Sequence, residues 1–281
     1  MRQFSFTYPY KVMKRDEMSG LLIAITVSLL VFPADVNGQK NANIFDALIG
    51  ETVQQTDEIS TSELHQILAD ESAYVFDARP FLEYSISHIP GAVNVSAKPG
   101  IRISMYISDV AEILRVVNGA KQMPIVLYCN GPFCGKSNRL ANELLKEGFT
   151  NVRRYQLGIP VWRALGGITQ IEPEGLRYVY SQDDTAVFVD IREEDTFRNR
   201  AIAKSRNIPR SLVLTEKDTG EVGRAKDDGR LPMNDHNTRI IVIGDTPEDV
   251  QYVAEALTAE AFQNVAFFSG TFEEAISIIE R

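Results

Sequence analysis

The chain has 281 residues, 44% of them hydrophobic, which is enough for about two domains of ordinary size, each with its own core. A formal net charge of -9 argues against a nucleic-acid partner, because binding a phosphate backbone needs clustered lysine and arginine. With two cysteines and three histidines (His65, His88 and His236) far apart in the chain, we expect neither a metal site nor a disulfide scaffold.

The first 38 residues have the pattern of a leader rather than of a folded domain. A basic stretch from Lys11 to Arg15 precedes an apolar run from Leu21 to Phe32, and Pro33 and small residues follow. This order is typical of a secretory signal peptide and predicts export to the periplasm or outside the cell. The alternative is an uncleaved membrane anchor, since the segment 18–34 reaches the lower limit of about 17 residues for a spanning helix.

After a polar stretch (39–56) with no clear pattern, short apolar segments alternate with amphipathic ones. Ser60 or Thr61 is the expected cap of the first helix. In chain order we expect a helix over 59–69, a strand over 73–76, a helix over 80–85, a strand over 92–95, a helix over 108–117, a strand over 125–128, a helix over 138–146 and a strand over 152–155. This alternation predicts the α/β class, with a mostly parallel sheet covered by helices on both faces.

The pattern then begins again. Residues 76–79 match residues 189–192, and residues 149–152 match residues 262–265, both at a separation of 113 positions. We infer a domain duplication with a linker at about 166–174, where glycines and a proline gather. The expected boundaries are 57–168 for the first domain and 172–281 for the second, with a charged surface loop over 217–232.

The chemistry concentrates around Cys129, which directly follows a predicted buried strand and precedes a glycine-containing loop and a helix beginning near Ser137. This places the cysteine at the carboxyl end of the sheet, where α/β proteins bind ligands. Inward-turned N–H groups of the loop and the helix dipole form a cradle for an anion. We predict that Cys129 is a nucleophile whose thiolate is favoured by this cradle and by Lys136; the alternative is a buried cysteine that only packs. The residues expected to bind substrate are Asn130, Gly131, Pro132, Phe133, Gly135, Lys136 and Ser137.

The chain resembles the rhodanese family at three places. The first consists of Phe76-Asp77-Ala78-Arg79 and His88-Ile89-Pro90-Gly91-Ala92, the second is the cysteine loop, and the third is Gly158-Ile159-Pro160-Val161-Trp162. The resemblance covers about 57–168, and more weakly 172–281. It implies two tandem rhodanese-like domains, of which the first is active.

The resemblance also implies an activity. A sulfurtransferase of this family moves sulfane sulfur from thiosulfate or a related donor to a thiol or cyanide through a persulfide, here on Cys129, and needs no cofactor. The implied partners are a small sulfur donor and a thiol acceptor, which can be a protein. Asp77 and Arg79 would support the geometry of the site. A non-catalytic persulfide carrier or docking module is the competing class.

Two features depart from the family pattern. Ser87 stands where a glycine usually precedes the histidine, and Lys136 lies later in the loop than the basic residue of most rhodaneses. Gly135 occupies the place where tyrosine-phosphatase-like relatives carry an arginine. A rhodanese-related phosphatase or arsenate reductase is therefore a weaker alternative, because it would lack the arginine that clamps a tetrahedral oxyanion.

Cys134 is the second cysteine of the loop, five residues after Cys129. It is either a resolving cysteine that attacks an oxidised or persulfidated Cys129, or a loop residue with no role. An oxidising compartment would favour pairing of the two.

The second half lacks a nucleophile. Gly244 stands at the position of Cys129, and the acidic residues Asp245, Glu248 and Asp249 follow it. We expect this half to be a structural or partner-binding copy, since these carboxylates would repel an anionic donor. The alternative, an acid–base pair of Asp245 and Asp249, is disfavoured because neighbouring loop carboxylates are usually solvated.

Overall fold

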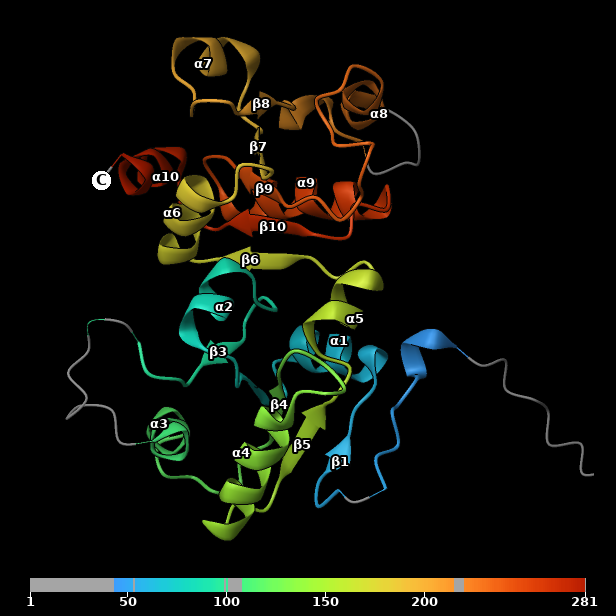
Figure 1. Ribbon diagram of the computed structural model, residues 1–281, viewed down its shortest axis with the longest axis vertical. Helices are drawn as coiled ribbons and strands as arrows, with labels where there is room; N and C mark the ends of the chain where they lie inside the picture. The colour runs from blue at the N-terminus through green and yellow to red at the C-terminus, as the bar shows by residue number, and fades with distance from the viewer. Residues whose placement is uncertain (1–42, 53, 99, 101–107, 215–219, 281) are drawn as a thin grey trace, which may run out of the picture. The chain divides into compact units, whose positions relative to one another are not determined.

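The computed structural model describes residues 43–280, apart from 53, 99, 101–107 and 215–219 (Figure 1). The expected signal peptide or membrane anchor over 1–38 lies outside the described residues. Among the residues described, no helix combines the length and the apolar character that a membrane crossing requires.

The first half forms a parallel five-stranded sheet with the strand order β1-β5-β4-β2-β3 (Figure 1). The strands are β1 (Asp57–Glu58), β2 (Tyr74–Asp77), β3 (Val93–Asn94), β4 (Ile125–Tyr128) and β5 (Val152–Tyr155). The helices are the 3-10 helix η1 (Ile44–Asp46), α1 (Thr61–Asp70), α2 (Phe81–Ile86), α3 (Asp109–Val116), α4 (Gly135–Lys146) and α5 (Gly158–Ala164).

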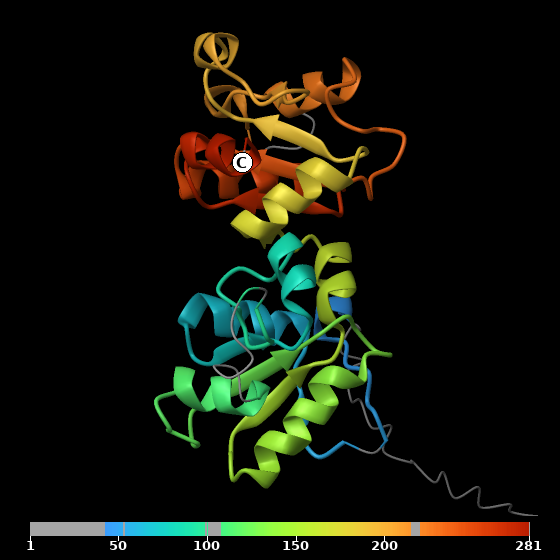
Figure 2. The same ribbon diagram turned by 60° about the vertical axis from the view of Figure 1, so that its left-hand side comes forward.

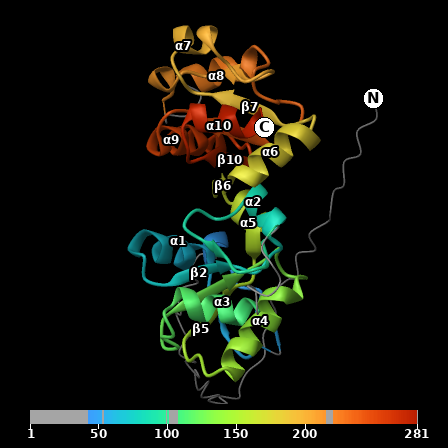
Figure 3. The ribbon, with the colours of Figure 1, turned by 90° about the vertical axis from the view of Figure 1, so that its left-hand side faces the viewer.

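Helices cover both faces of this sheet (Figures 2 and 3). Side chains alternate along a strand, so Ile125 and Leu127 of β4 pack with the residues of α3 and α4, whereas Val126 and Tyr128 pack with those of α1 and α5. The same alternation turns Cys129, the next residue, to the α4 face.

The second half repeats the arrangement with the strand order β6-β10-β9-β7-β8, again parallel. The strands are β6 (Thr169–Ile171), β7 (Val187–Asp190), β8 (Arg206–Asn207), β9 (Ile240–Ile243) and β10 (Val265–Phe268). The helices are α6 (Pro173–Gln182), α7 (Glu194–Asn199), the 3-10 helix η3 (Arg210–Leu212), α8 (Gly220–Asp227), α9 (Pro247–Ala259) and α10 (Phe272–Ile279). Two parallel sheets, each covered on both faces, confirm the predicted α/β class.

Local sequence explains the boundaries that were predicted well. Ser60 caps α1, because its side chain accepts a hydrogen bond from the Glu63 N–H while the Glu63 carboxylate accepts one from the Ser60 N–H. The strands predicted over 125–128 and 152–155 have those bounds in the structure.

Two expectations were wrong. The helix expected over 138–146 begins at Gly135, so Cys134 is its N-cap and Gly135, Lys136 and Ser137 form its first turn. The segment expected to be a loop over 217–232 contains α8, which buries Val222 and Ala225 in the core; this tertiary packing offsets the weak helix preference of its glycines.

Backbone hydrogen bonds connect the two halves. His88 and Gln170 exchange N–H···O bonds of 3.0 and 2.9 Å, and the Glu172 N–H donates to the Ser85 carbonyl at 2.7 Å. Gly175 of α6 packs directly on this carbonyl, because an added Cβ at Gly175 would overlap it. The contact between α2 and α6 therefore depends on a residue without a side chain.

Candidate active site

Cys129 follows the central strand of the first sheet at its carboxyl end. It is 1% exposed and belongs to the core cluster that includes Ala78 and Leu140. The sulfur therefore sits between the sheet and the first turn of α4, where the helix presents unpaired N–H groups.

The loop from Cys129 to Cys134 is held by short-range contacts. The Cys134 N–H donates to the Gly131 carbonyl at 3.0 Å, and Gly131 has a φ of +99°, a left-handed conformation that favours glycine. The Asn130 amide donates to the Glu83 carboxylate of α2 at 2.5 Å. Phe133 is fully exposed. The loop thus turns its backbone back toward Cys129 and directs one large apolar side chain to solvent.

The Cys129 thiol has two close partners. It donates to the Cys134 carbonyl at 3.2 Å and lies 3.4 Å from the Ser137 hydroxyl. Burial raises the pKa of Cys129, the hydrogen bond to Cys134 raises it further, and the contacts with Ser137 oppose the change. The expectation that the cradle favours a Cys129 thiolate is therefore wrong for the protein without bound substrate: desolvation of the sulfur outweighs the helix N-terminus.

The lowered pKa belongs to Cys134 instead. Its partial burial would raise this pKa, but the hydrogen bond from Cys129, the N–H groups of Lys136 and Asn130, and the Lys136 charge together lower it. Lys136 thus acts on the half-exposed sulfur at the helix N-terminus.

Asp77 and Arg79 form a buried ion pair beside the strand ends. The guanidinium donates to the Asp77 carboxylate at 2.5 and 3.0 Å and to the Ser87 carbonyl at 2.6 Å, and Asn94 donates to the carbonyls of Asp77 and Arg79. Ser87 has a φ of -170°, an extended conformation open to any residue, which explains how serine replaces the glycine. The contacts of this pair lie within the scaffold and fit a supporting role.

The second half repeats this scaffold. Arg192 pairs with Asp190 and donates to the Arg200 carbonyl, and Asn207 donates to the carbonyls of Asp190 and Arg192. Each of these residues lies 113 positions after its counterpart in the first half. The duplication inferred from sequence thus includes a complete hydrogen-bond network.

The turn between β5 and α5 packs against the backbone of the cysteine loop. The Ile159 N–H donates to the Cys129 carbonyl at 3.2 Å, and an added Cβ at Gly131 would lie 3.1 Å from the Leu157 carbonyl oxygen. Gly158 has a φ of +65° and leaves no room for a side chain against Cys129. Sequence reasoning used Gly158 and Ile159 only as part of a family motif and did not assign them to the site.

The polar stretch before β1 supports the loop from another side. Arg154, buried on β5, donates to Glu51 at 2.8 Å, to Thr56 at 3.1 Å and to Gln156 at 2.7 Å. Gln156 in turn donates to the Glu51 carboxylate at 2.5 Å and to the Pro132 carbonyl at 3.4 Å. Sequence reasoning missed this network, because no local pattern marks Glu51 as the partner of a residue about 100 positions away.

The second half has no room for a nucleophile. Tyr128 pairs with Asp77 and Ile243 with Asp190 in the two sheets, so Gly244 stands where Cys129 stands in the first half. A Cβ at Gly244 would lie 2.6 Å from Ile191, the counterpart of Ala78. The larger side chain therefore fills the space that the sulfur occupies in the first half.

Asp249, one member of the acid–base pair that was considered, has two other partners in the structure. Asp249 accepts from the Thr246 hydroxyl at 2.8 Å and pairs with Arg210 at 3.2 Å. Thr246 is thus the N-cap of α9, and the ion pair of Asp249 with Arg210 stabilises its first turn. Asp249 and Asp245 line a hollow of about 380 Å³ together with Ile191 and Arg210.

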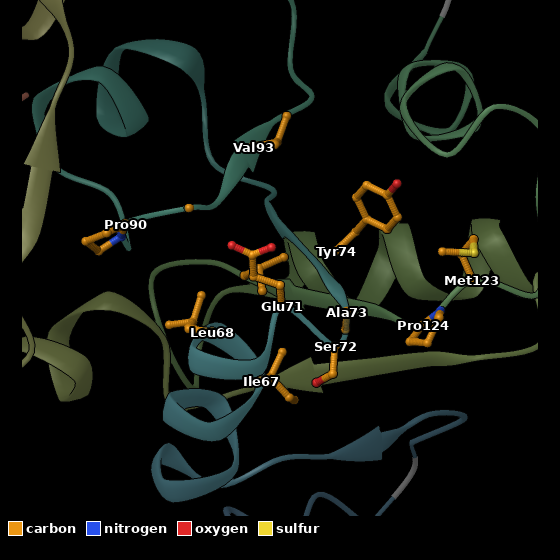
Figure 4. A pocket seen from close by; sticks show the side chains of 12 residues that line it. Ile67, Leu68, Glu71, Ser72, Ala73, Tyr74, Pro90, Val93, Met123 and Pro124 are labelled. Carbon is orange, nitrogen blue, oxygen red and sulfur yellow. The ribbon is translucent and has the colours of Figure 1, made fainter.

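A hollow of about 440 Å³ lies at the opposite edge of the first sheet, where β2 and β4 begin. Figure 4 shows its lining side chains, which include Leu68, Glu71, Tyr74 and Met123. Since Cys129 follows the other end of β4, this hollow is separate from the candidate site.

The first half is an α/β domain whose central parallel strand is followed directly by a cysteine, a turn and a helix N-terminus, and the second half is a copy without the cysteine. The family model described as "Rhodanese-like domain" matches residues 60–165 and 178–277. The chain therefore belongs to the rhodanese-like family and carries two tandem domains.

Individual relatives cover parts of the chain. The chain is 30% identical over 139 residues to a tRNA uridine(34) hydroxylase of Staphylococcus epidermidis. This match covers 48% of this chain and 39% of the relative. It is 29% identical over 110 residues to an HTH-type transcriptional regulator of Mycobacterium tuberculosis, covering 39% and 43% respectively. The chain thus spans less than half of these relatives. Among solved structures it is similar to a thiosulfate sulfurtransferase of Pseudomonas aeruginosa, with 18% identity, a TM-score of 0.32 and coverage of 78% of this chain and 44% of that one.

Proposed function

We propose that the chain is a sulfane-sulfur transferase of the rhodanese type that works through Cys129. The Cys129 sulfur attacks the outer sulfur of thiosulfate or a related donor, the donor S–S bond breaks, and sulfite leaves with the electron pair. The resulting persulfide passes its outer sulfur to a thiol or to cyanide. The chemistry involves only the donor, the acceptor and the cysteine, so we propose no cofactor.

The observation that supports this function best is the position of Cys129. Its sulfur lies at the carboxyl end of β4, against Ser137 in the first turn of α4, so an anion formed on it faces the helix N-terminus. A persulfide carries its charge one atom farther out than a thiolate. We infer that loading sulfur moves the charge from the buried position toward the N–H groups and Lys136, which offsets the raised pKa of the free thiol.

Burial favours the second candidate, a persulfide carrier or docking module. With Cys129 1% exposed, a donor reaches the sulfur only after the loop moves. A carrier would take up sulfur once and release it only to one protein partner, whereas an enzyme would turn over with cyanide.

Phosphatase or arsenate reductase chemistry has less support. The segment from Cys129 to Ser137 contains no arginine, and Gly135 begins α4 where an oxyanion clamp would be needed. A tRNA-directed activity, as in the hydroxylase relatives, has little support from a chain with a net charge of -9.

We also propose that the protein is exported, with membrane anchoring by an uncleaved leader as the alternative. The proposal rests on the sequence of residues 1–38. The N-terminal sequence of the protein recovered from cell fractions tests it. A mature chain beginning near residue 39 in the periplasm or medium supports export, and an intact chain in the membrane fraction supports the anchor.

Thiocyanate formation from thiosulfate and cyanide tests the activity. With cyanide in excess and a reductant present to keep both cysteines reduced, the parent protein should turn over repeatedly, and Cys129→Ser should not, because a hydroxyl cannot form a persulfide. Circular dichroism should show the same fold for both. A single turnover by the parent would favour the carrier, and activity of Cys129→Ser near the parent level would refute the assignment.

A further inference from the structure

Two free thiols lie in one loop of the first domain, and the fold brings them together. The Cys129 thiol donates to the Cys134 carbonyl at 3.2 Å, and the turn closed by the Cys134 N–H and the Gly131 carbonyl folds Cys134 back over Cys129. The side chains of the two cysteines also interact, and this interaction contributes to the lowered pKa of Cys134. Two cysteines that bond to each other have Cα atoms within about 7 Å, and this turn keeps the Cys134 backbone within hydrogen-bonding reach of the Cys129 sulfur.

The two sulfurs differ in access to solvent. Cys129 is buried, whereas Cys134 is partly exposed at the start of α4. A thiol from solution therefore meets Cys134 before it meets Cys129.

The two sulfurs also differ in acidity, because the hydrogen bond from Cys129, the N–H groups at the start of α4 and the charge of Lys136 lower the pKa of Cys134. The N–H groups and the charge of Lys136 do not depend on the Cys129 thiol, so they still favour a Cys134 thiolate when Cys129 carries a sulfane sulfur. Attack by a thiolate on a sulfur–sulfur bond is the elementary step of thiol–disulfide exchange.

We propose that Cys134 resolves the Cys129 persulfide and so releases hydrosulfide from the site. The inference rests on the proposed function, since it begins from sulfur loaded on Cys129. The Cys134 sulfur attacks the inner sulfur of the persulfide, a bond forms between the two cysteine sulfurs, and the bond to the outer sulfur breaks. The outer sulfur leaves with the electron pair and takes the proton of Cys134.

The electrons balance within the loop. The sulfane sulfur is reduced to hydrosulfide while the two cysteine sulfurs are oxidised to a disulfide, so no outside oxidant is needed. An external dithiol then reduces the disulfide by exchange, with the partly exposed Cys134 as the sulfur it meets first. The net reaction converts thiosulfate and a dithiol into sulfite, hydrosulfide and a disulfide. The acceptor class is therefore a dithiol, of a protein or a small molecule.

A single-turnover experiment with the full chain tests this. The pre-reduced protein is freed of reductant and mixed with thiosulfate without oxygen, and sulfite, sulfide and intact mass are measured. The parent should release one sulfite and one sulfide per chain and lose its two free thiols. Cys134→Ser should release one sulfite, release no sulfide, and retain the mass of one added sulfur on the peptide that holds Cys129. Cys134→Ala should behave in the same way if the serine hydroxyl plays no part.

The outcomes separate the two proposals. A parent protein that accumulates a stable persulfide and releases no sulfide would contradict the resolving role of Cys134 and leave the transferase intact. Sulfide release by Cys134→Ser at the parent level would contradict it as well. If neither thiosulfate nor inorganic polysulfide loads sulfur on any of the proteins, the transferase itself is refuted, and the resolving step falls with it.

Discussion

Gly158 and Cys129 pack backbone against backbone. Gly158 has a φ of +65°, and a Cβ added to it would overlap the Cys129 carbonyl oxygen and lie 2.7 Å from the Gly131 Cα. The next residue, Ile159, donates its N–H to the same carbonyl at 3.2 Å. The turn that begins α5 therefore fixes the position of the cysteine loop at the end of the sheet.

Replacing Gly158 by alanine should damage the site more than the fold. The left-handed backbone costs alanine about 1–2 kcal/mol, and the overlap adds roughly 1–3 kcal/mol or displaces the loop. We expect thiosulfate-to-cyanide transfer to fall by more than the loss of folded protein explains. Gly119→Ala is the matched control, because Gly119 has a φ of +78° with open space around its Cβ position. Equal effects of the two substitutions on activity would contradict the positioning role.

The sequence predicted the elements that depend on local pattern. The strands over 125–128 and 152–155 are short apolar runs, and the cap at Ser60 is a local signal, so all three could be predicted. The bond between Glu51 and Arg154 could not, because it joins segments that meet only in the folded chain. The prediction that the Cys129 thiolate is favoured was wrong for the same reason, since the pKa of Cys129 depends on burial and on the contact with Cys134.

Lys136→Ala should weaken the use of an anionic donor more than that of a neutral one. Lys136 supplies a positive charge beside the Cys134 sulfur, in the loop that holds Cys129. A single charge in a partly solvated site is worth about 1 kcal/mol, which corresponds to roughly a fivefold change in rate. The ratio of kcat/KM for thiosulfate to kcat/KM for a neutral organic polysulfide should fall by that factor. Lys146→Ala, an exposed change at the far end of the same helix, is the control. Equal losses with both donors would count against a role of the charge.

A cysteine at position 244 of the second domain, where glycine stands in place of Cys129, should destabilise the fold. A Cβ at Gly244 would lie 2.6 Å from Ile191, so Gly244→Cys should lower the free energy of unfolding by about 1–3 kcal/mol through overpacking. Adding Ile191→Ala should recover part of this loss, which urea unfolding can measure. We expect no transferase gain, because only three residues, 244–246, separate β9 from α9. Additive losses in the double variant would show that Ile191 is not the obstacle.

Buried His88 should make the protein less stable in acid. Burial, with the Arg79 charge adding and the bond to the Tyr84 carbonyl opposing, lowers the pKa of His88 from 6.5 to about 4. Between these values the unfolded chain binds a proton that the folded chain does not. Stability from neutral His88 is therefore complete above pH about 6.5 and is lost as the pH falls toward about 4, by on the order of 3 kcal/mol.

Urea unfolding of the parent and of His88→Gln at several pH values between about 4 and 7 measures this contribution. The parent should lose stability with falling pH more steeply than the variant. The comparison cancels the titration of groups that do not contact His88. The Glu172 carboxylate lies 3.5 Å from His88, and its raised pKa changes stability in the opposite direction. Parallel slopes for the two proteins would contradict the assignment to His88.

The central claim is that Cys129 carries the transferred sulfur, and the mass of the loaded protein tests it most directly. Cys134→Ser protein, in which the persulfide cannot be resolved within the loop, is treated with thiosulfate without oxygen and digested for mass spectrometry. The account predicts a gain of one sulfur atom, confined to the peptide that holds Cys129 and removed by cyanide with the formation of thiocyanate. An unchanged mass after treatment with thiosulfate and with inorganic polysulfide, or added sulfur on a peptide without Cys129, would contradict it.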